Sequence, residues 1–218
     1  MKGREKDEGG AGMAYWMAGI CFAVMVIFYL LYEGSKFSDK FSKRVSTVFK
    51  CTTTSCAVLL AVCGAALHGG ANWLLAAGLL ICAVADGVLV YYFIPGMGIF
   101  GLGHIAYCAA YILKSPPGTL NFLLMAFLMA GVTFGALKFK KRMGKRVVPF
   151  TMYALILCVM LALGATQTPL LALGALFFII SDATLARNIL LGATRRQDYF
   201  SLGCYYLGQF LIAASILF

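Results

Sequence analysis

Charged residues are scarce in this sequence. Asp, Glu, Lys and Arg make up 12% of its 218 residues, and hydrophobic residues make up 62%. A typical soluble domain is about a quarter charged and about half apolar. The shortage of charge therefore excludes an ordinary soluble domain and indicates a polytopic membrane protein that folds as one compact bundle. Its net charge of +10 lies in loops between apolar runs, so we expect contact with anionic lipid headgroups and no nucleic acid.

Several motifs of enzyme and cofactor chemistry are missing or out of context. The eight cysteines form no CxxC pair, and most lie within apolar runs, so we expect no disulfide framework. A G-x-S-x-G elbow is absent, which argues against a serine lipase. Residues 96–101 match G-x-G-x-x-G without the βαβ context of a nucleotide site, so we predict a tight re-entry there and no bound cofactor. No cleavable signal peptide is evident before the first apolar run.

The apolar runs that are present predict an all-α, polytopic transmembrane bundle of eight helices. A span needs about 20 apolar residues, with shorter ones tolerated inside a bundle. We expect residues 1–12 to be a disordered polar tail and residues 13–218 to be a single domain, and we interpret Gly131 and Gly135 as a GxxxG site of close helix packing. The predicted spans are 13–32, 50–67, 71–91, 97–113, 119–138, 148–165, 169–188 and 199–218.

The basic residues divide unequally between the two sides of such a bundle. With eight spans, fourteen of the eighteen Lys and Arg residues fall on one side. By the positive-inside rule these loops are cytoplasmic, and both termini lie on the other side. We therefore predict a multi-pass integral membrane protein, in the plasma membrane of a bacterium or the endoplasmic reticulum of a eukaryote.

Two carboxyl groups and one imidazole lie inside the predicted spans, away from their ends: those of Asp86, Asp182 and His104. A charge in hydrocarbon costs several kcal/mol, so such residues are functional-site candidates. Counted from the cytoplasmic ends of their helices, all three lie roughly 8–10 Å deep. Lys50 begins the second span on the same side, and Arg187 lies at the end of the seventh. The sequence thus predicts a shared polar pocket in the cytoplasmic half.

Two interpretations of this pocket remain open at the level of sequence. The carboxyls can be structural, each bridging helices beside a basic residue. Alternatively, Asp86 and Asp182 hold different protonation states and perform acid–base chemistry, with His104 as an orienting or relaying group. Tyr107, one turn beyond His104, and Gln209 could reach the same cavity. A zinc site is a weaker alternative, because the second histidine, His68, lies on the opposite side.

A short internal repeat also appears. Asp86 and Asp182 each begin a D-x-x-L pattern, on the third helix of each four-helix half, and Gly103-His104 and Gly208-Gln209 occupy comparable places on the fourth. Four spans in each half would make the two halves parallel, as in some transporters. A proton-coupled lipid or small-solute transporter is therefore an alternative function.

At these residues the sequence resembles the lysoplasmalogenases, the YhhN-like family of multi-pass membrane hydrolases. Ala stands at position 85 where the family usually has Gly, but the carboxylate that follows is kept. The blocks that carry the resemblance, in family order over residues 49–212, are Phe49-Lys50-Cys51, Ala85-Asp86-Gly87-Val88-Leu89, Phe93-Ile94-Pro95-Gly96-Met97 with Phe100, His104 and Tyr107, then Pro149 with Tyr153, Gly174-Ala175-Leu176-Phe177-Phe178-Ile179-Ile180-Ser181-Asp182 with Leu185-Ala186, and Tyr205-Tyr206-Leu207-Gly208-Gln209.

The resemblance implies hydrolysis of the vinyl ether bond of a lysophospholipid substrate, a lysoplasmalogen, to a fatty aldehyde and a glycerophospho-alcohol. Under this interpretation the catalytic candidates are Asp86, Asp182 and His104. The substrate-binding candidates are Lys50, Tyr107, Tyr153, Arg187, Asn188, Tyr206 and Gln209. An intramembrane aspartyl protease is disfavoured, because Asp86 lacks the G-x-G-D context of such enzymes.

Overall fold

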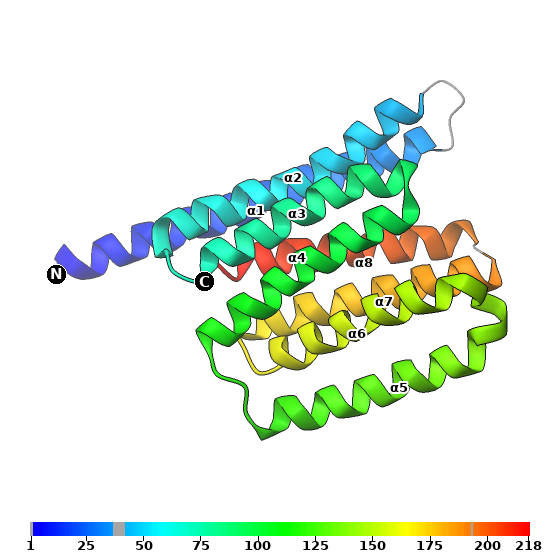
Figure 1. Ribbon diagram of the computed structural model, residues 1–218. Helices are drawn as coiled ribbons and strands as arrows, with labels where there is room; N and C mark the ends of the chain where they lie inside the picture. Colours follow the sequence, from blue (N-terminus) through cyan, green and yellow to red (C-terminus); the bar gives the residue numbers. More distant parts are fainter. Residues whose placement is uncertain (1, 37–41, 193) are drawn as a thin grey trace.

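The computed structural model describes residues 2–36, 42–192 and 194–218, and only the backbone of residues 2–11 (Figure 1). Within these ranges it contains no strand, which confirms the all-α prediction. The helices are α1 (Lys2–Lys36), α2 (Lys43–His68), α3 (Asn72–Tyr91), α4 (Phe93–Lys114), α5 (Thr119–Met143), α6 (Val147–Gly164), α7 (Pro169–Leu191) and α8 (Arg195–Ala214), with a 3-10 turn, η1 (Gly144–Arg146), between α5 and α6.

Each predicted span falls on one helix, although several helices extend beyond the predicted bounds, such as α2, which begins at Lys43, and α5, which ends at Met143. Two other differences concern α1 and α4. First, α1 begins at Lys2, so the backbone of the tail that we expected to be disordered is described as helical. Second, the break before α4 falls at Tyr92, in extended conformation, one turn earlier than predicted. Pro95 then lies in the first turn of α4, where a missing N–H costs little. Gly96 is required there, because a Cβ would come 2.5 Å from the Leu89 Cα.

Six helical segments of the described chain are long and apolar enough to cross a membrane. One of them, Thr119–Gly164, runs through α5, η1 and α6 together. Helix α8 does not qualify, because it carries charged residues in its first turn and the polar side chains Ser201, Tyr205 and Gln209 in its interior-facing part. Apolarity therefore supports a multi-pass membrane protein but does not support the predicted count of eight spans.

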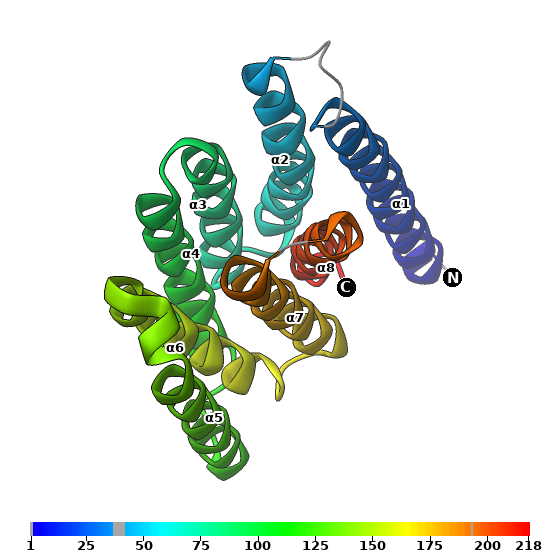
Figure 2. The same cartoon turned by 90° about the vertical axis from the view of Figure 1, so that its right-hand side faces the viewer.

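Helix α8 occupies the centre of the bundle. Viewed end-on, it lies among α1, α2, α3 and α7, whereas α5 lies at the outer edge and packs mainly on α6 (Figure 2). The central position explains its composition, since its polar side chains face protein instead of lipid. Most exposed surface elsewhere carries large apolar side chains, as expected for contact with acyl chains.

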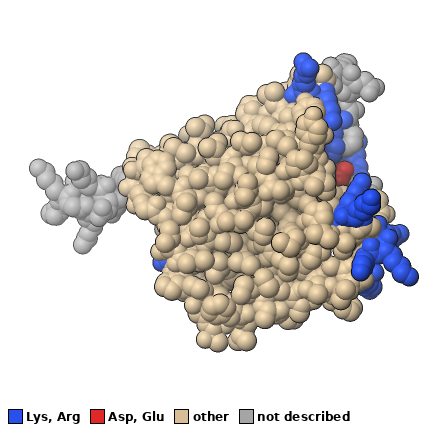
Figure 3. Space-filling view, in the orientation of Figure 1, with Lys and Arg blue, Asp and Glu red and all other residues tan. Residues whose placement is uncertain are grey.

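Basic side chains gather at one end of the bundle, where α1, α3, α5 and α7 finish and the following helices begin (Figure 3). We call this the basic end; it includes Lys36 at the end of α1, Lys140 and Arg142 at the end of α5, and Arg195 at the start of α8. The clustering agrees with the charge asymmetry expected of the sequence. Which side of a membrane the basic end faces stays a prediction.

Two pairs of helices make the same close contact, which supports the internal repeat. Gly78 of α3 meets Gly103 of α4, with the Cβ of either residue placed 3.0 Å from the other's carbonyl oxygen. Gly174 of α7 meets Gly208 of α8 in the same way, at 3.2 and 3.0 Å. In addition, the second helix of each half packs on the fourth helix of the other half: α2 on α8, and α6 on α4. The two halves are therefore related by an approximate two-fold arrangement.

This arrangement places the two carboxyls at equivalent positions. Asp86 and Asp182 each lie eight residues after the contact glycine of their helix, Gly78 and Gly174 respectively. Two turns of helix separate each pair, so both acids project at the same level towards the basic end. The repeat thus explains why two acids meet in one layer of the bundle.

The predicted GxxxG contact in α5 is wrong. A Cβ added at Gly131 or Gly135 would meet no atom within 4 Å in the described chain. The close helix contacts are made instead by the Gly78–Gly103 and Gly174–Gly208 pairs. Hydropathy and a short spacing rule do not reveal which face of an all-apolar helix turns towards another helix.

Gly78→Ala is expected to destabilise the fold by about 1–3 kcal/mol, because its methyl group would overlap the Tyr107 ring and press on the Gly103 carbonyl. Gly135→Ala is the matched control: it adds the same methyl group in open space and should leave stability unchanged or raise it slightly. Unfolding of both variants in detergent micelles measures the difference. Equal effects of the two substitutions would contradict this packing.

Candidate functional site

Asp86 is fully buried and has partners from two helices. Lys50 of α2 forms an ion pair with it, with its Nζ 3.0 Å from Asp86 Oδ1. The hydroxyls of Thr54 (α2) and Tyr205 (α8) both donate to Asp86 Oδ2, the second over 2.7 Å. An ion pair and two hydroxyl donors stabilise the charged form of this group, so we interpret Asp86 as a carboxylate.

A buried chain of hydrogen bonds holds Tyr205 in this orientation. Gln209 Nε2 donates to the Tyr205 hydroxyl over 2.9 Å, and the Tyr107 hydroxyl lies 3.3 Å from Gln209 Oε1. Tyr107 is also 3.7 Å from the Cys82 sulfur. Gln209, Tyr107 and Cys82 are fully buried and do not line the cavity, so they hold Tyr205, and through it Asp86, from behind the cavity wall.

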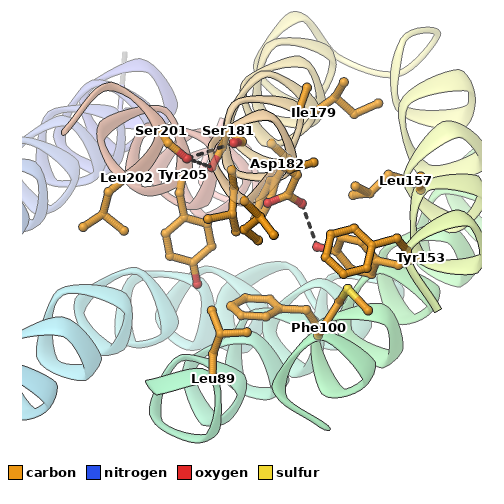
Figure 4. A pocket seen from close by; sticks show the side chains of 18 of the residues that line it. Leu89, Phe100, Tyr153, Leu157, Ile179, Ser181, Asp182, Ser201, Leu202 and Tyr205 are labelled. Carbon is orange, nitrogen blue, oxygen red and sulfur yellow. Dashed lines mark hydrogen bonds between the residues drawn. The ribbon is translucent and has the colours of Figure 1, made fainter. Parts of the chain in front are cut away.

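Asp182 forms a separate cluster. Its Oδ2 accepts a hydrogen bond of 2.6 Å from the Tyr153 hydroxyl of α6 (Figure 4). The same hydroxyl lies 3.2 Å from Nε2 of His104, on α4. Within the described chain no Lys or Arg forms an ion pair with Asp182. The two symmetry-related acids therefore differ in their partners, one beside a cation and the other beside a phenol.

One cavity of about 430 Å³ joins the two clusters. Asp86, Lys50 and Tyr205 line it on one side, and Asp182 and Tyr153 on the other. Its remaining wall is mostly apolar, as in Figure 4 for Phe100, Leu157 and Ile179. The cavity thus brings two carboxyl groups to an apolar chamber of the size that binds small amphiphilic molecules.

Only some of the residues predicted for the site line the cavity. Asp86, Asp182, Lys50 and Tyr153 line the cavity together. His104, Tyr107 and Gln209 lie behind the cavity wall. His104 reaches Asp182 only through the Tyr153 hydroxyl. Tyr206 donates weakly to the Lys50 carbonyl, at 3.4 Å, and is a packing residue.

Two further substrate-binding candidates, Arg187 and Asn188, are also absent from the cavity wall. Arg187 is exposed. Asn188 is buried and donates to Asp198 Oδ1 over 3.1 Å. The predicted convergence near the basic end thus holds for the acids and Lys50 but not for Arg187, because each residue adds about 100° of rotation around a helix and depth alone does not determine direction.

Sequence reasoning missed several polar residues that line the cavity or contact its acids, among them Thr54, Tyr205, Lys36 and Asp198. Thr54 and Tyr205 were not among the candidates for the site. Their polarity inside apolar helices was the available signal, since a buried hydroxyl needs a partner. No group of three or more His, Cys, Asp or Glu side chains within the described residues is placed to hold a metal ion.

The comparisons with known proteins agree with the resemblance. A lysoplasmalogenase TMEM86B from Rattus norvegicus is 32% identical over 79% of this chain and 73% of its own length. The Homo sapiens TMEM86B is 33% identical over 68% of the chain and 66% of its own, and the Homo sapiens TMEM86A, also named a lysoplasmalogenase, is 28% identical over 78% of each. No solved structure matches the chain. The family model described as the YhhN family matches residues 45–216, and the chain belongs to that family.

Proposed function

We propose that this protein is a membrane hydrolase that cleaves the vinyl ether bond of lysoplasmalogens, releasing a fatty aldehyde and a glycerophospho-alcohol. The names of its relatives support the reaction class. The observation that carries the proposal is the pair of carboxyls with unequal partners, Asp86 with Lys50 and Asp182 with Tyr153, on the wall of one largely apolar cavity.

Hydrolysis of a vinyl ether begins with transfer of a proton to carbon. In our proposal Asp182 is the acid, because it has no cationic neighbour in the described structure to compensate a negative charge. It donates its proton to the alkenyl carbon remote from the ether oxygen. The carbon bonded to oxygen then becomes an oxocarbenium ion. Tyr153 and, through it, His104 position the carboxyl for this step and are positioning residues.

Asp86 acts on the resulting cation. Its carboxylate, held by Lys50 and Tyr205, stabilises the positive charge and directs a water to the carbon bonded to oxygen. The water gives up a proton, and a hemiacetal forms. Its carbon–oxygen bond to glycerol then breaks, the hydroxyl proton of the hemiacetal is transferred to the glycerol oxygen, and aldehyde is released. One water is consumed, and Asp182 regains the proton that it donated.

The cavity suits the other parts of such a substrate. The apolar side chains near Asp182, among them Leu157, Cys158 and Ile179, can accommodate the alkenyl chain. The opposite part of the lining includes Lys36 and Asp198 at the basic end. A lysophospholipid likewise has an apolar chain at one end and a charged headgroup at the other, so its two ends match the two parts of the cavity.

We further propose that all eight helices, α8 included, cross the bilayer as one domain, with the basic end in the cytoplasm. The polar residues of α8 are shielded by its neighbours, so its low apolarity is compatible with a span. A cysteine-accessibility map of residues 138–147 tests this orientation. Labelling from the outside of intact cells would contradict it.

Neither rival from the sequence gains support from a specific observation. The best argument for a transporter was the approximate two-fold arrangement, but the relatives described above are named lysoplasmalogenases. The same names give no support to an aspartyl protease.

The proposal is tested by incubating the purified protein with a lysoplasmalogen and measuring free aldehyde. We expect release that depends on protein and time. A 1-O-alkyl lysophospholipid is the matched control substrate, because its saturated ether cannot be protonated on carbon and should yield no aldehyde. Absence of aldehyde, together with proton-coupled uptake of lipid into liposomes, would overturn the proposal in favour of transport.

A further inference from the structure

An ion pair lies where the cavity reaches the basic end. Lys36, the last residue of α1, has its Nζ 3.5 Å from Asp198 Oδ2 in the first turn of α8, and both side chains line the cavity. The other oxygen of Asp198 accepts a hydrogen bond from Asn188. The two charged side chains are 35% and 32% exposed, so a ligand can reach them. This pair has no role in the proposed chemistry of Asp86 and Asp182.

One face of α8 connects the pair to the reacting groups. Asp198, Ser201 and Tyr205 follow at spacings of three and four residues, which places them along one side of the helix, and all three line the cavity. Asp198 and Tyr205 are two turns apart, about 10 Å along the axis. Tyr205 in turn contacts Asp86. A phosphoglycerol unit can bridge such a separation between a headgroup at Asp198 and an ether oxygen near the two carboxyls.

We propose that Lys36 and Asp198 form the binding site for a zwitterionic headgroup, with Lys36 on the phosphate and Asp198 on the ammonium group. This inference rests on the proposed function, whose substrate it specifies as amine-bearing lysophospholipids. A zwitterion lets both side chains exchange their mutual partner for an opposite charge on the ligand. An anionic headgroup without an amine would place its phosphate next to the Asp198 carboxylate, and the repulsion between the two negative charges disfavours binding of such a ligand.

The competing interpretation of the pair is structural. It joins α1 to α8, and Asp198 lies in the first turn of α8, where a carboxylate stabilises the helix. A partly exposed ion pair contributes little to stability, so a purely structural pair would be of small consequence. The two interpretations differ in one respect: only a headgroup site makes the effect of Asp198 depend on the amine of the ligand.

The experiment measures binding of two probes that lack a vinyl ether, 1-O-alkyl lysophosphatidylcholine and 1-O-alkyl lysophosphatidic acid, to the full chain in lipid nanodiscs. Asp198→Asn should weaken binding of the choline probe about tenfold and leave binding of the lysophosphatidic acid unchanged or tighter. Lys36→Gln should weaken both. Arg196→Gln, the control, removes a charge from the same turn of α8 but not from the cavity wall, and should change neither.

Asp198→Glu keeps the charge on a longer side chain and should preserve the preference for the choline probe, which guards against a folding defect in Asp198→Asn. Equal weakening of both probes by Asp198→Asn, or no change in either, would overturn the headgroup site. The outcome is independent of the reaction. Discrimination between probes without any aldehyde release from lysoplasmalogen would retain the site and remove the hydrolase, and the converse would remove only the site.

Discussion

Aldehyde release from a lysoplasmalogen is expected to fall about a thousandfold in Asp182→Asn. Asparagine has the same shape and can still accept the hydrogen bond of the Tyr153 hydroxyl, but it has no proton of the right acidity for the alkenyl carbon. General acid catalysis of this kind contributes on the order of 10²–10⁴ in rate. The measurement is the initial rate of aldehyde formation at saturating substrate.

Binding of the 1-O-alkyl lysophosphatidylcholine probe is the control for Asp182→Asn and should be unchanged, because the headgroup contacts lie at the other end of the cavity. Tyr153→Phe should reduce the rate less than Asp182→Asn does, since the Tyr153 hydroxyl orients the acid but does not supply the proton. A rate within about tenfold of the native protein in Asp182→Asn would show that another group is the acid.

The second large effect is on stability. Lys50→Met should destabilise the protein by about 3–5 kcal/mol, because it leaves the Asp86 carboxylate buried without its cation. Methionine has a similar length, so the loss of packing is small. Unfolding in mixed micelles, followed by the loss of helical signal, measures the change.

The double variant Lys50→Met with Asp86→Asn separates charge from packing. It removes both charges, and the side-chain oxygen of the introduced asparagine can still accept from Thr54 and Tyr205, so most of the lost stability should return. Aldehyde release should not return with it, because the carboxylate is gone. If Lys50→Met alone were as stable as the native protein, Asp86 would not be an ionised partner of Lys50.

Much of the fold could be predicted because the bilayer limits the options. Each spanning segment has to satisfy its own backbone hydrogen bonds, so the length of an apolar run and the breaker that ends it predict a helix and its bounds. The run ending at Tyr91 and the Thr168-Pro169 start of α7 are examples. The charge asymmetry of the loops and the depths of Asp86 and Asp182 depend on the same counting along the chain.

What the tertiary structure alone decided is which side each helix turns to its neighbours. Helices α6 and α7 are apolar on nearly all sides, so no pattern marks the direction of Tyr153 or Asp182, or shows that His104 reaches the acid only through a phenol. Asp86 and Tyr205 are 119 residues apart, and Lys36 and Asp198 are 162 apart.

The site depends on such long-range pairs, and the reason is geometric. Position along a helix axis is additive in residue number, whereas rotation about the axis and the choice of neighbouring helix depend on packing of the whole bundle. Counting residues therefore predicted that two acids lie at one depth. The packing of α2 on α3 gave one acid a lysine partner, and the packing of α6 on α7 left the other beside a tyrosine. The packing of α1 on α8 placed Lys36 with Asp198 where the cavity reaches the basic end.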